Sequence, residues 1–393
     1  LKAVEADGYT HVVVLGMGGS SLAPDVFANA FGHDHEGLTL HVLDSTVPKA
    51  VLTLAWEIDP AATLFIVSTK SGGTVETLSF FKYFYNLTLE RAGQGAVGDH
   101  FVAITDQDSK LHRLAERYGF RDIFLNDPNI GGRYSALSFF GLVPAGLAGI
   151  DLALLLSRAQ IMMSNNESCN DILDGNNLGG RLGAIMGAMA RSGRDKVTLV
   201  SSPGLANFGD WVEQLIAEST GKDGKGILPV VGEPVGSPEM YGQDRLFVYL
   251  RLDHDTTHDD ALAMLRAAGH PVLTLRLKDR YDMGGQFFLW EMATAVAGHV
   301  LGIQPFDQPN VESAKVLARA MVTSYHEDCR LPDGEINELN ETSVATFLAQ
   351  AQPGDYISLQ AYIQPTADSE AALRALQLEL RDRTKLATTV GYG

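Results

Sequence analysis

The sequence predicts an α/β protein with two doubly wound parallel sheets, each a layer between helices (an αβα sandwich), and a C-terminal α/β extension. Three observations predict this fold class. Short, nearly all-apolar runs alternate with segments of helical spacing, as in parallel sheets that are buried on both faces. The alternation restarts after a helical bridge near residues 137–175. The length of 393 residues also suits two to three domains.

The first half of the chain contains four apolar runs that we expect to be strands, at 11–16, 38–44, 62–69 and 100–105. The run HVVVLG at 11–16 is rich in β-branched residues and ends in glycine, after which LAPDVFANAF has helical spacing. Further helices are expected at 74–90 and 110–119. We assign this half to a first domain, residues 1–150.

The second half repeats the pattern. We expect strands at 196–202, 245–252 and 271–277, and helices at 177–193, 208–222, 259–269 and 287–302. These elements form a second domain, residues 151–330. The third part of the chain is an extension, residues 331–393, which begins with the acidic stretch LPDGEINELNETS. We expect it to contain a helix, the strand 355–363, the helix 369–384 and a last strand.

The composition narrows the classes of function. With 30 Lys and Arg against 48 Asp and Glu, the net charge is −18. An acidic surface repels nucleic acids and anionic membranes, so we expect neither as a partner. An anionic substrate then needs a local cationic pocket. The two cysteines, Cys169 and Cys329, form no metal-binding pattern, and no signal peptide or membrane-spanning run occurs, which favours a cytoplasmic protein without metal.

The glycine-rich segment LGMGGSSLAP, residues 15–24, follows the first expected strand and opens a helix. Such loops bring backbone N–H groups and a helix N-terminus to an anion. A dinucleotide site is one interpretation, because Asp44 at the end of the second strand resembles a ribose-binding acid. The fingerprint requires a third glycine where Ser21 stands, however. A tight turn without ligand is the other alternative.

The segment STKSGGTVET, residues 68–77, occupies the same kind of position after the third expected strand. In a parallel sheet both loops lie at the carboxyl ends of their strands, where ligands bind. We therefore expect one phosphate to be surrounded by Gly19, Ser20, Thr69, Lys70, Ser71 and Thr74, with Lys70 supplying the charge. A cluster of hydroxyls that merely caps the following helix is the alternative.

Four motifs, the first made of two loops, together resemble the phosphoglucose isomerase family, which is built from two sugar-isomerase (SIS) domains. They are the paired loops above, NIGGRYSALS at 129–138, QLIAESTGK at 214–222 and FDQPNVESAK at 306–315. The chain looks most similar to the isomerase part of bifunctional transaldolase/phosphoglucose isomerases. Because it begins with Leu1 shortly before a strand, we expect a transaldolase domain to precede it in a longer polypeptide.

The resemblance implies interconversion of glucose 6-phosphate and fructose 6-phosphate through a cis-enediol, without a cofactor. It implies that Glu218 is the base that moves a proton between C1 and C2, and that Arg133 stabilises the enediolate. Gln214 lies four residues before Glu218, on the same helix face, and joins the substrate contacts. Gln308 and Lys315 carry over as sugar and ring-oxygen contacts, Lys315 as a catalytic group. Taken singly, Glu218, Arg133 and Lys315 are each more typical of an ordinary surface side chain than of a catalytic group.

One departure concerns the group that opens the sugar ring. Family members usually have a histidine after GQ, supplied by the neighbouring subunit, whereas MYGQDRLFVYL at 240–250 places Asp244 there. Either Asp244 substitutes, or another group opens the ring, or that group lies outside this sequence. A homodimer remains an expectation of the resemblance.

Three other functions compete with the isomerase. A non-catalytic SIS module that binds a sugar phosphate would keep the 68–77 loop but would not need Glu218, Arg133 and Lys315 together. An amidotransferase-type isomerase also uses two SIS domains, but the sequence contains no glutaminase domain and such enzymes are not expected to carry the GGR motif. A dehydrogenase would require the dinucleotide reading of residues 15–24.

Overall fold

The structure is a computed structural model that describes residues 1–32, 37–167, 169–173, 175–307, 312–330, 338 and 340–392, without the side chains of 312–315. Its first half contains a five-stranded, all-parallel sheet with the strand order β2-β1-β3-β4-β5. The strands are β1 (His11–Leu15), β2 (Thr39–Leu43), β3 (Thr63–Ser68), β4 (Phe101–Asp106) and β5 (Asp122–Asn126). β3 is buried along its whole length, as a central strand covered on both faces should be.

The second half contains a four-stranded parallel sheet with the order β7-β6-β8-β9. Its strands are β6 (Lys196–Ser201), β7 (Leu228–Val230), β8 (Arg245–Leu252) and β9 (Val272–Leu277). The predicted α/β class with two parallel sheets is confirmed. Two edge strands, β5 and β7, were not predicted.

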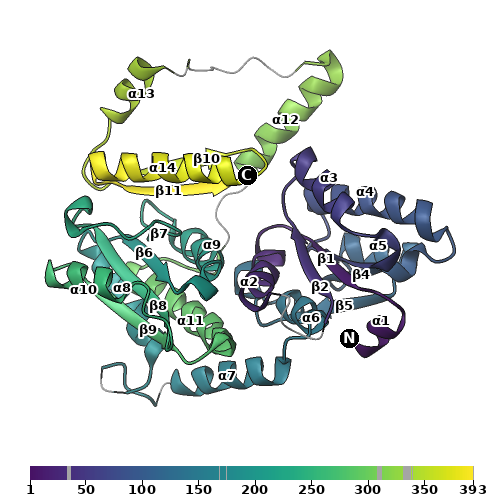
Figure 1. Ribbon diagram of the computed structural model, residues 1–393, viewed down its shortest axis with the longest axis horizontal. Coiled ribbons are helices and arrows are strands. Elements are labelled where there is room, and N and C mark those ends of the chain that lie inside the picture. Colours follow the sequence, from purple (N-terminus) through teal and green to yellow (C-terminus); the bar gives the residue numbers. More distant parts are fainter. Residues whose placement is uncertain are drawn as a thin grey trace.

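Helices cover both sheets (Figure 1). They are α1 (Lys2–Ala6), α2 (Leu22–Phe31), α3 (Pro48–Glu57), α4 (Val75–Ala92), α5 (Lys110–Tyr118), α6 (Phe139–Leu147), α7 (Leu152–Asn165), α8 (Leu178–Arg191), α9 (Phe208–Thr220), α10 (Asp259–Ala267) and α11 (Met283–Leu301). α6 and α7 form the predicted helical bridge, and α7 runs beneath both halves in Figure 1. Among the described residues, no helix is both long and apolar enough to cross a membrane.

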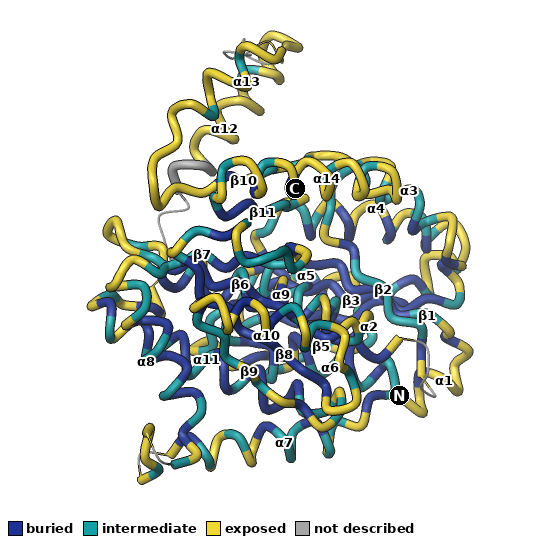
Figure 2. The backbone as a smooth tube through the Cα atoms, turned by 60° about the vertical axis from the view of Figure 1, so that its left-hand side comes forward, coloured by how far each residue is buried: buried dark blue, intermediate teal, exposed yellow. Residues whose placement is uncertain are grey.

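The C-terminal extension comprises α12 (Glu312–Asp328), α13 (Glu341–Leu348), β10 (Tyr356–Ala361), α14 (Ala367–Thr384) and β11 (Ala387–Tyr392). β10 and β11 pair in parallel, and α14 packs on them above the second sheet (Figure 1). Buried Arg381 of α14 donates to the Pro234 carbonyl at 2.6 Å and lies 3.8 Å from Glu233, which also contacts Arg245. α12 and α13 project from the body and are largely exposed (Figure 2).

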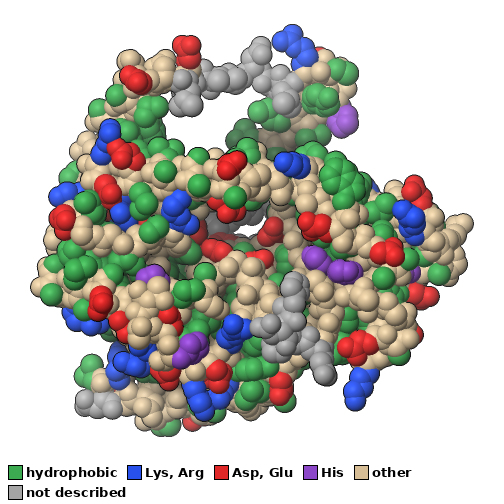
Figure 3. Space-filling model, in the orientation of Figure 1, with side chains coloured by type: hydrophobic (Ala, Val, Ile, Leu, Met, Phe, Trp, Pro, Cys, Tyr) green, Lys and Arg blue, Asp and Glu red, His purple; other side chains and the backbone are tan. Residues whose placement is uncertain are grey.

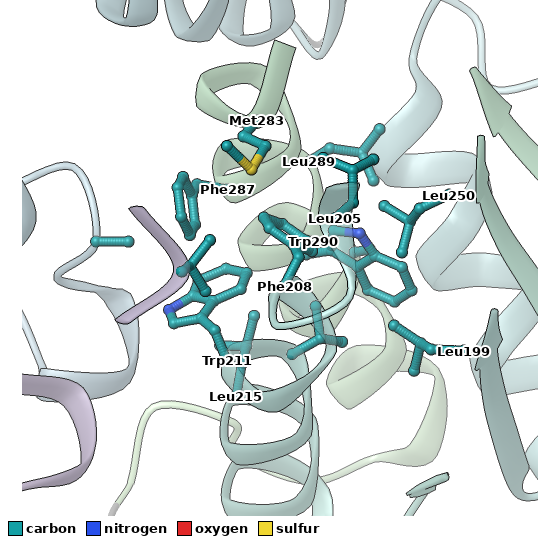
Figure 4. Close-up of a cluster of buried hydrophobic side chains, with 14 of the residues drawn as sticks. Leu199, Leu205, Phe208, Trp211, Leu215, Leu250, Met283, Phe287, Leu289 and Trp290 are labelled. Atoms are coloured by element: carbon teal, nitrogen blue, oxygen red, sulfur yellow. The ribbon is translucent and has the colours of Figure 1, made fainter. Parts of the chain in front are cut away.

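One cluster of buried apolar side chains contains residues of both halves and joins them. Phe27 of α2 packs against Phe287 of α11 with ring centroids 5.6 Å apart, and Phe287 also contacts Trp211 of α9 at 4.7 Å. Figure 4 shows Phe287 and Trp211 in one cluster with Trp290 and Met283, and Phe27 belongs to the same cluster. This packing fixes α9 against the first half, which positions the candidate site. The boundaries at residues 150 and 330 remain predictions.

Candidate active site

Two loops of the first sheet meet at its carboxyl edge, as predicted. The first contains a short 3₁₀ turn (η1, Gly18–Ser20), and the second runs from Thr69 to Thr74. The Ser68 hydroxyl donates to the Ser20 carbonyl at 3.3 Å, and the Thr69 and Thr74 hydroxyls lie 2.9 Å apart. Among the residues that the structure describes, no side chain caps the N-terminus of α4 after Thr74. Its first N–H groups are therefore available to an anion.

The sequence predicted that Lys70 supplies positive charge to a phosphate, whereas in the structure its ammonium binds other groups of the protein. Its ammonium lies 2.7 Å from Asp106 Oδ2 and donates to the Pro128 carbonyl at 2.7 Å. The lysine thus joins the ends of β3 and β4 to the loop after β5, and Asp106 balances its charge. Its role as a phosphate contact stays a prediction. We call the two loops, residues 18–20 and 69–74, the phosphate cradle; its hydroxyl and backbone N–H groups are donors that no carboxylate of this kind neutralises. Ser71 accepts from the Gly73 N–H at 3.3 Å.

The glycine at position 19 permits the close approach of a third loop. A Cβ at Gly19 would lie 2.3 Å from the carbonyl oxygen of Gly132, so that no other residue fits without a backbone shift. Gly132 opens the 3₁₀ turn η4 (Gly132–Tyr134). Gln214 approaches from α9, since a Cβ at Gly18 would lie 2.7 Å from its Nε2 atom. Gln214 therefore lies beside the cradle, and its role as a substrate contact stays a prediction.

Arg133 and Glu218, the two residues singled out by the family resemblance, lie together. Arg133 Nε is 3.3 Å from Glu218 Oε1, and the guanidinium is buried while the carboxylate is partly open. A second donor, Nη1, reaches the buried Ser219 hydroxyl at 2.7 Å and the Pro305 carbonyl at 2.9 Å. The α9 terminus therefore supplies both a carboxylate and a hydroxyl to one arginine.

Residues 304–307 are held over the site by two cations. Arg133 Nη2 donates to the carbonyls of Phe306 and Asp307 at 3.4 and 3.0 Å. The Lys222 ammonium donates to the carbonyls of Gln304 and Asp307. Burial lowers the pKa of Lys222, and the neighbouring Arg133 charge lowers it further. This segment leads into Gln308, which lies outside the described residues, and into α12, where the Lys315 side chain is likewise outside them.

Tyr134 extends the network toward α11. Its hydroxyl lies 3.0 Å from Ser219 Oγ, and the Arg133 guanidinium lies 5.6 Å from the ring centroid. Burial raises the pKa of Tyr134, and the charges of Glu291 and Glu218 raise it further. Burial alone raises the pKa of Glu291 on α11 to about 8, and its Oε1 has no hydrogen-bond partner among the described residues.

Figure 3 shows acidic side chains around the hollow at the centre of one face. Four carboxylates influence one another electrostatically: Asp25 of α2, Asp44 after β2, and Asp210 and Glu213 of α9. Burial and mutual repulsion raise the pKa of Asp210 to about 6 and that of Glu213 to about 7. The described residues contain no group of acids, histidines or cysteines suited to a metal ion.

Asp244, the candidate substitute for the ring-opening histidine, precedes β8 at the amino end of that strand. Its Oδ2 lies 3.6 Å from the ammonium of buried Lys196, and its Oδ1 has no hydrogen-bond partner in the described part of the chain. Lys196 also binds Asp195 at 2.7 Å. The carboxylate is thus engaged with a structural lysine, and its part in ring opening stays a prediction.

Sequence reasoning missed Ser219, Lys222, Tyr134 and Asp106 as structural members of the site. The first three lie inside the motifs ESTGK and GGRYS. The sequence therefore located these residues near the site but did not predict which groups they contact. Asp106 follows the fourth expected strand by one residue. A polar residue at the carboxyl end of a buried strand was the available signal for it.

Comparison with known proteins finds relatives that cover most of the chain. A sequence model described as phosphoglucose isomerase matches residues 2–224. The chain is 30% identical over 378 residues to the glucose-6-phosphate isomerase of Rubrobacter xylanophilus, covering 81% of this chain and 84% of that protein. The glucose-6-phosphate isomerase of Thermus thermophilus is also 30% identical, over 78% of this chain and 82% of that one.

Solved structures share the fold. A hypothetical protein, TT0462, from Thermus thermophilus superposes with a TM-score of 0.71 and 26% identity, covering 82% of this chain and 86% of that one. A glucose-6-phosphate isomerase from Chlamydia trachomatis superposes with a TM-score of 0.68 at 20% identity, over 89% of this chain and 75% of that one. The latter likeness supports the architecture alone.

Proposed function

Because this chain belongs to the phosphoglucose isomerase family, we propose that it interconverts glucose 6-phosphate and fructose 6-phosphate through a cis-enediol. The observation that carries the proposal is the 3.3 Å contact between Arg133 Nε and Glu218 Oε1, next to loops suited to a phosphate. One carboxylate and one permanent cation at a single point are what a proton transfer between adjacent carbons requires.

The reaction follows from these groups. Glu218 removes the C2 proton of the open-chain aldose, the C–H electron pair forms a C1–C2 double bond, and the C1 carbonyl pair moves onto its oxygen. Arg133 stabilises that oxygen, because a guanidinium keeps its proton and cannot act as a competing acid. The proton of O2 then moves to O1, and the O2 electron pair forms the C2 carbonyl while the C1–C2 double-bond pair takes the proton from Glu218 to C1.

The phosphate cradle acts at a distance from the reacting carbons. We propose that Gly19, Ser20, Thr69, Ser71 and Thr74 hold the 6-phosphate. A fixed phosphate would orient C1 and C2 toward Glu218, which lowers the entropic part of the barrier. Lys70, Gln214, Gln308 and Lys315 complete the proposed substrate contacts.

A coupled assay of fructose 6-phosphate to glucose 6-phosphate tests the proposal. Glu218→Gln keeps an acceptor for Arg133 but removes the base, so turnover should fall by at least ~1,000-fold while sugar-phosphate binding survives. Glu57→Gln, at the exposed end of α3, is the matched control and should retain wild-type turnover. Binding without turnover in the wild-type protein would instead favour the non-catalytic SIS module.

We further propose that the chain acts in the cytoplasm, as a homodimer, and that a transaldolase domain precedes it in a longer polypeptide. The segment FGDWVEQLIAESTGKDGKGILPV supports the fusion by its resemblance to bifunctional proteins. Exposed apolar residues on α12, among them Leu317 and Tyr325, support self-association. Sedimentation that gives the monomer mass at micromolar concentration would contradict the dimer.

A further inference from the structure

The two sheets have the same strand order. In the first, the chain passes from β1 to β2 on one side and then crosses to β3 on the other. In the second, it passes from β6 to β7 and crosses to β8 in the same way. Open α/β sheets bind ligands outside the carboxyl ends of the strands where the order reverses. In the first sheet this point, between β1 and β3, holds the phosphate cradle. The counterpart in the second sheet lies between β6 and β8.

A cavity of about 550 Å³ occupies that counterpart position. It is lined by the loops that follow β6, β8 and β9, together with Phe31 from α2. Ser202 lies at its base, fully buried, and accepts a hydrogen bond from the Leu252 N–H at 3.0 Å. The cavity is separate from the candidate active site, because none of its lining residues belongs to the cradle or to the Arg133 network.

Cationic side chains surround this cavity. His254, Lys278 and Arg280 contribute to the lining and are exposed toward solvent. The Arg280 Nε atom lies 3.9 Å from where a Cβ on Gly204 would stand, so the guanidinium lies over the loop after β6. The lining thus carries two permanent cations, Lys278 and Arg280, against two carboxylates, in a chain whose net charge is −18.

Each of the two carboxylates of the lining accepts hydrogen bonds from the loop that carries it. Asp279 accepts from the Tyr281 N–H at 2.9 Å and lies 3.6 Å from Arg158 of α7. Asp255 accepts from the N–H and the hydroxyl of Thr257. Hydrogen bonds from Ser202 and Thr257 lower the pKa of Asp255 to about 2, so it stays ionised and acts only as an acceptor. An anion is therefore best placed near Lys278 and Arg280, away from Asp255.

We propose that this cavity binds a small phosphorylated metabolite at a second site, distinct from the active site. Lys278 and Arg280 hold the phosphate by charge-assisted hydrogen bonds. Asp255 accepts from a hydroxyl of the same molecule, which favours a hydroxylated phosphate ester over an apolar one. The ligand would touch the first half of the chain through Phe31 and the second half through the loop after β6.

Calorimetric titration with inorganic phosphate tests the site in the full chain. The cradle is first weakened by Thr69→Val and Thr74→Val, so that phosphate bound there does not dominate the signal. We expect this variant to retain one phosphate per chain. Adding Lys278→Gln and Arg280→Gln should weaken that binding at least tenfold. Arg266→Gln with Arg276→Gln removes the same charge from exposed positions outside the cavity, and should leave binding unchanged.

Two results would overturn the site. One is the absence of phosphate binding in the cradle variant, and the other is equal weakening by the Arg266/Arg276 control. In the otherwise wild-type chain, the Lys278→Gln/Arg280→Gln double variant should keep isomerase turnover within twofold of the wild type. Loss of turnover in this variant would contradict a separate site. Because phosphate binding is measured without turnover, the test holds whether or not the proposed isomerase activity is found.

Discussion

Arg133 reaches Glu218 with one nitrogen, at 3.3 Å, while its other two nitrogens are bound by Ser219 and by the carbonyls of residues 305–307. Every donor direction of this buried guanidinium is therefore used or aimed at the candidate base. Such an arginine cannot swing away when the carboxylate takes up a proton. The positive charge is in place before the enediolate forms, which is the condition for effective electrostatic stabilisation.

Ser219→Ala should slow turnover without abolishing substrate binding. The change removes the 2.7 Å hydrogen bond to Arg133 Nη1 and the 3.0 Å contact with the Tyr134 hydroxyl. We expect kcat to fall roughly tenfold with KM within a factor of two, and stability to fall by about 1–3 kcal/mol because buried polar groups lose a partner. Steady-state kinetics and urea unfolding measure both effects.

The control for that variant is Ser79→Ala, which removes an exposed hydroxyl bonded only within α4. It should match the wild type in both assays. If Ser219→Ala instead raised KM and left kcat intact, the hydroxyl would act on substrate binding and not through Arg133.

Gly19→Ala should damage the junction between the two loops of the site. The added methyl would lie 2.3 Å from the Gly132 carbonyl, which forces the 16–20 loop away from η4. Because the cradle and Arg133 then separate, the substrate is misplaced relative to the catalytic groups. A small misplacement of this kind is expected to lower kcat/KM at least ~100-fold. Gly95→Ala, where nothing lies within 4 Å of the added methyl, is the matched control. Equal activity of the two variants would contradict the described contact.

The sequence predicted the central elements better than the edges. The strand at 245–252 was predicted with the bounds of β8, because its apolar run is buried throughout. The edge strand β5 reads DIFLN and is partly exposed, so its pattern lacks the continuous apolar run of a central strand. The edge strand β7 contains Pro229, which argues against a strand in sequence but is tolerated at a sheet edge.

The sequence predicted which residues belong to the site, but it did not predict which of them contact one another. Motifs identified Arg133 and Glu218, and the structure brings them together. The ion pair of Lys70 with Asp106 joins residues 36 positions apart, and Arg133 reaches Pro305 across 172 positions. Such pairings are set by how strands and loops meet at the sheet edge, which no local pattern encodes.

Glu291 should make the protein less stable as pH rises. Its pKa is about 8 in the folded chain, above the ordinary value of 4.5. Between these values the folded state holds a proton that the unfolded state has released, so stability falls with rising pH and the loss is complete above pH 8. Glu291→Gln removes this titration and should stabilise the protein at pH 8 by on the order of 3–5 kcal/mol, with little effect near pH 4.

Urea unfolding midpoints at pH 5, 6.5 and 8 measure the effect. The midpoints of the wild type and of Glu291→Gln should diverge as pH rises, whereas Glu57→Gln should follow the wild type. Parallel curves for all three proteins would mean that Glu291 is ionised in the folded chain at neutral pH.

The central claim is that Glu218 carries a proton between C1 and C2 of the sugar. The most direct measurement is the fate of deuterium at C2 of glucose 6-phosphate during turnover in ordinary water. We predict that the wild type transfers part of the label to C1 of fructose 6-phosphate and loses part to water, because a carboxylic acid exchanges its proton. Glu218→Gln should bind the sugar but release no label above the enzyme-free rate. Complete retention of label by the wild type, or label release that persists in Glu218→Gln, would contradict the account.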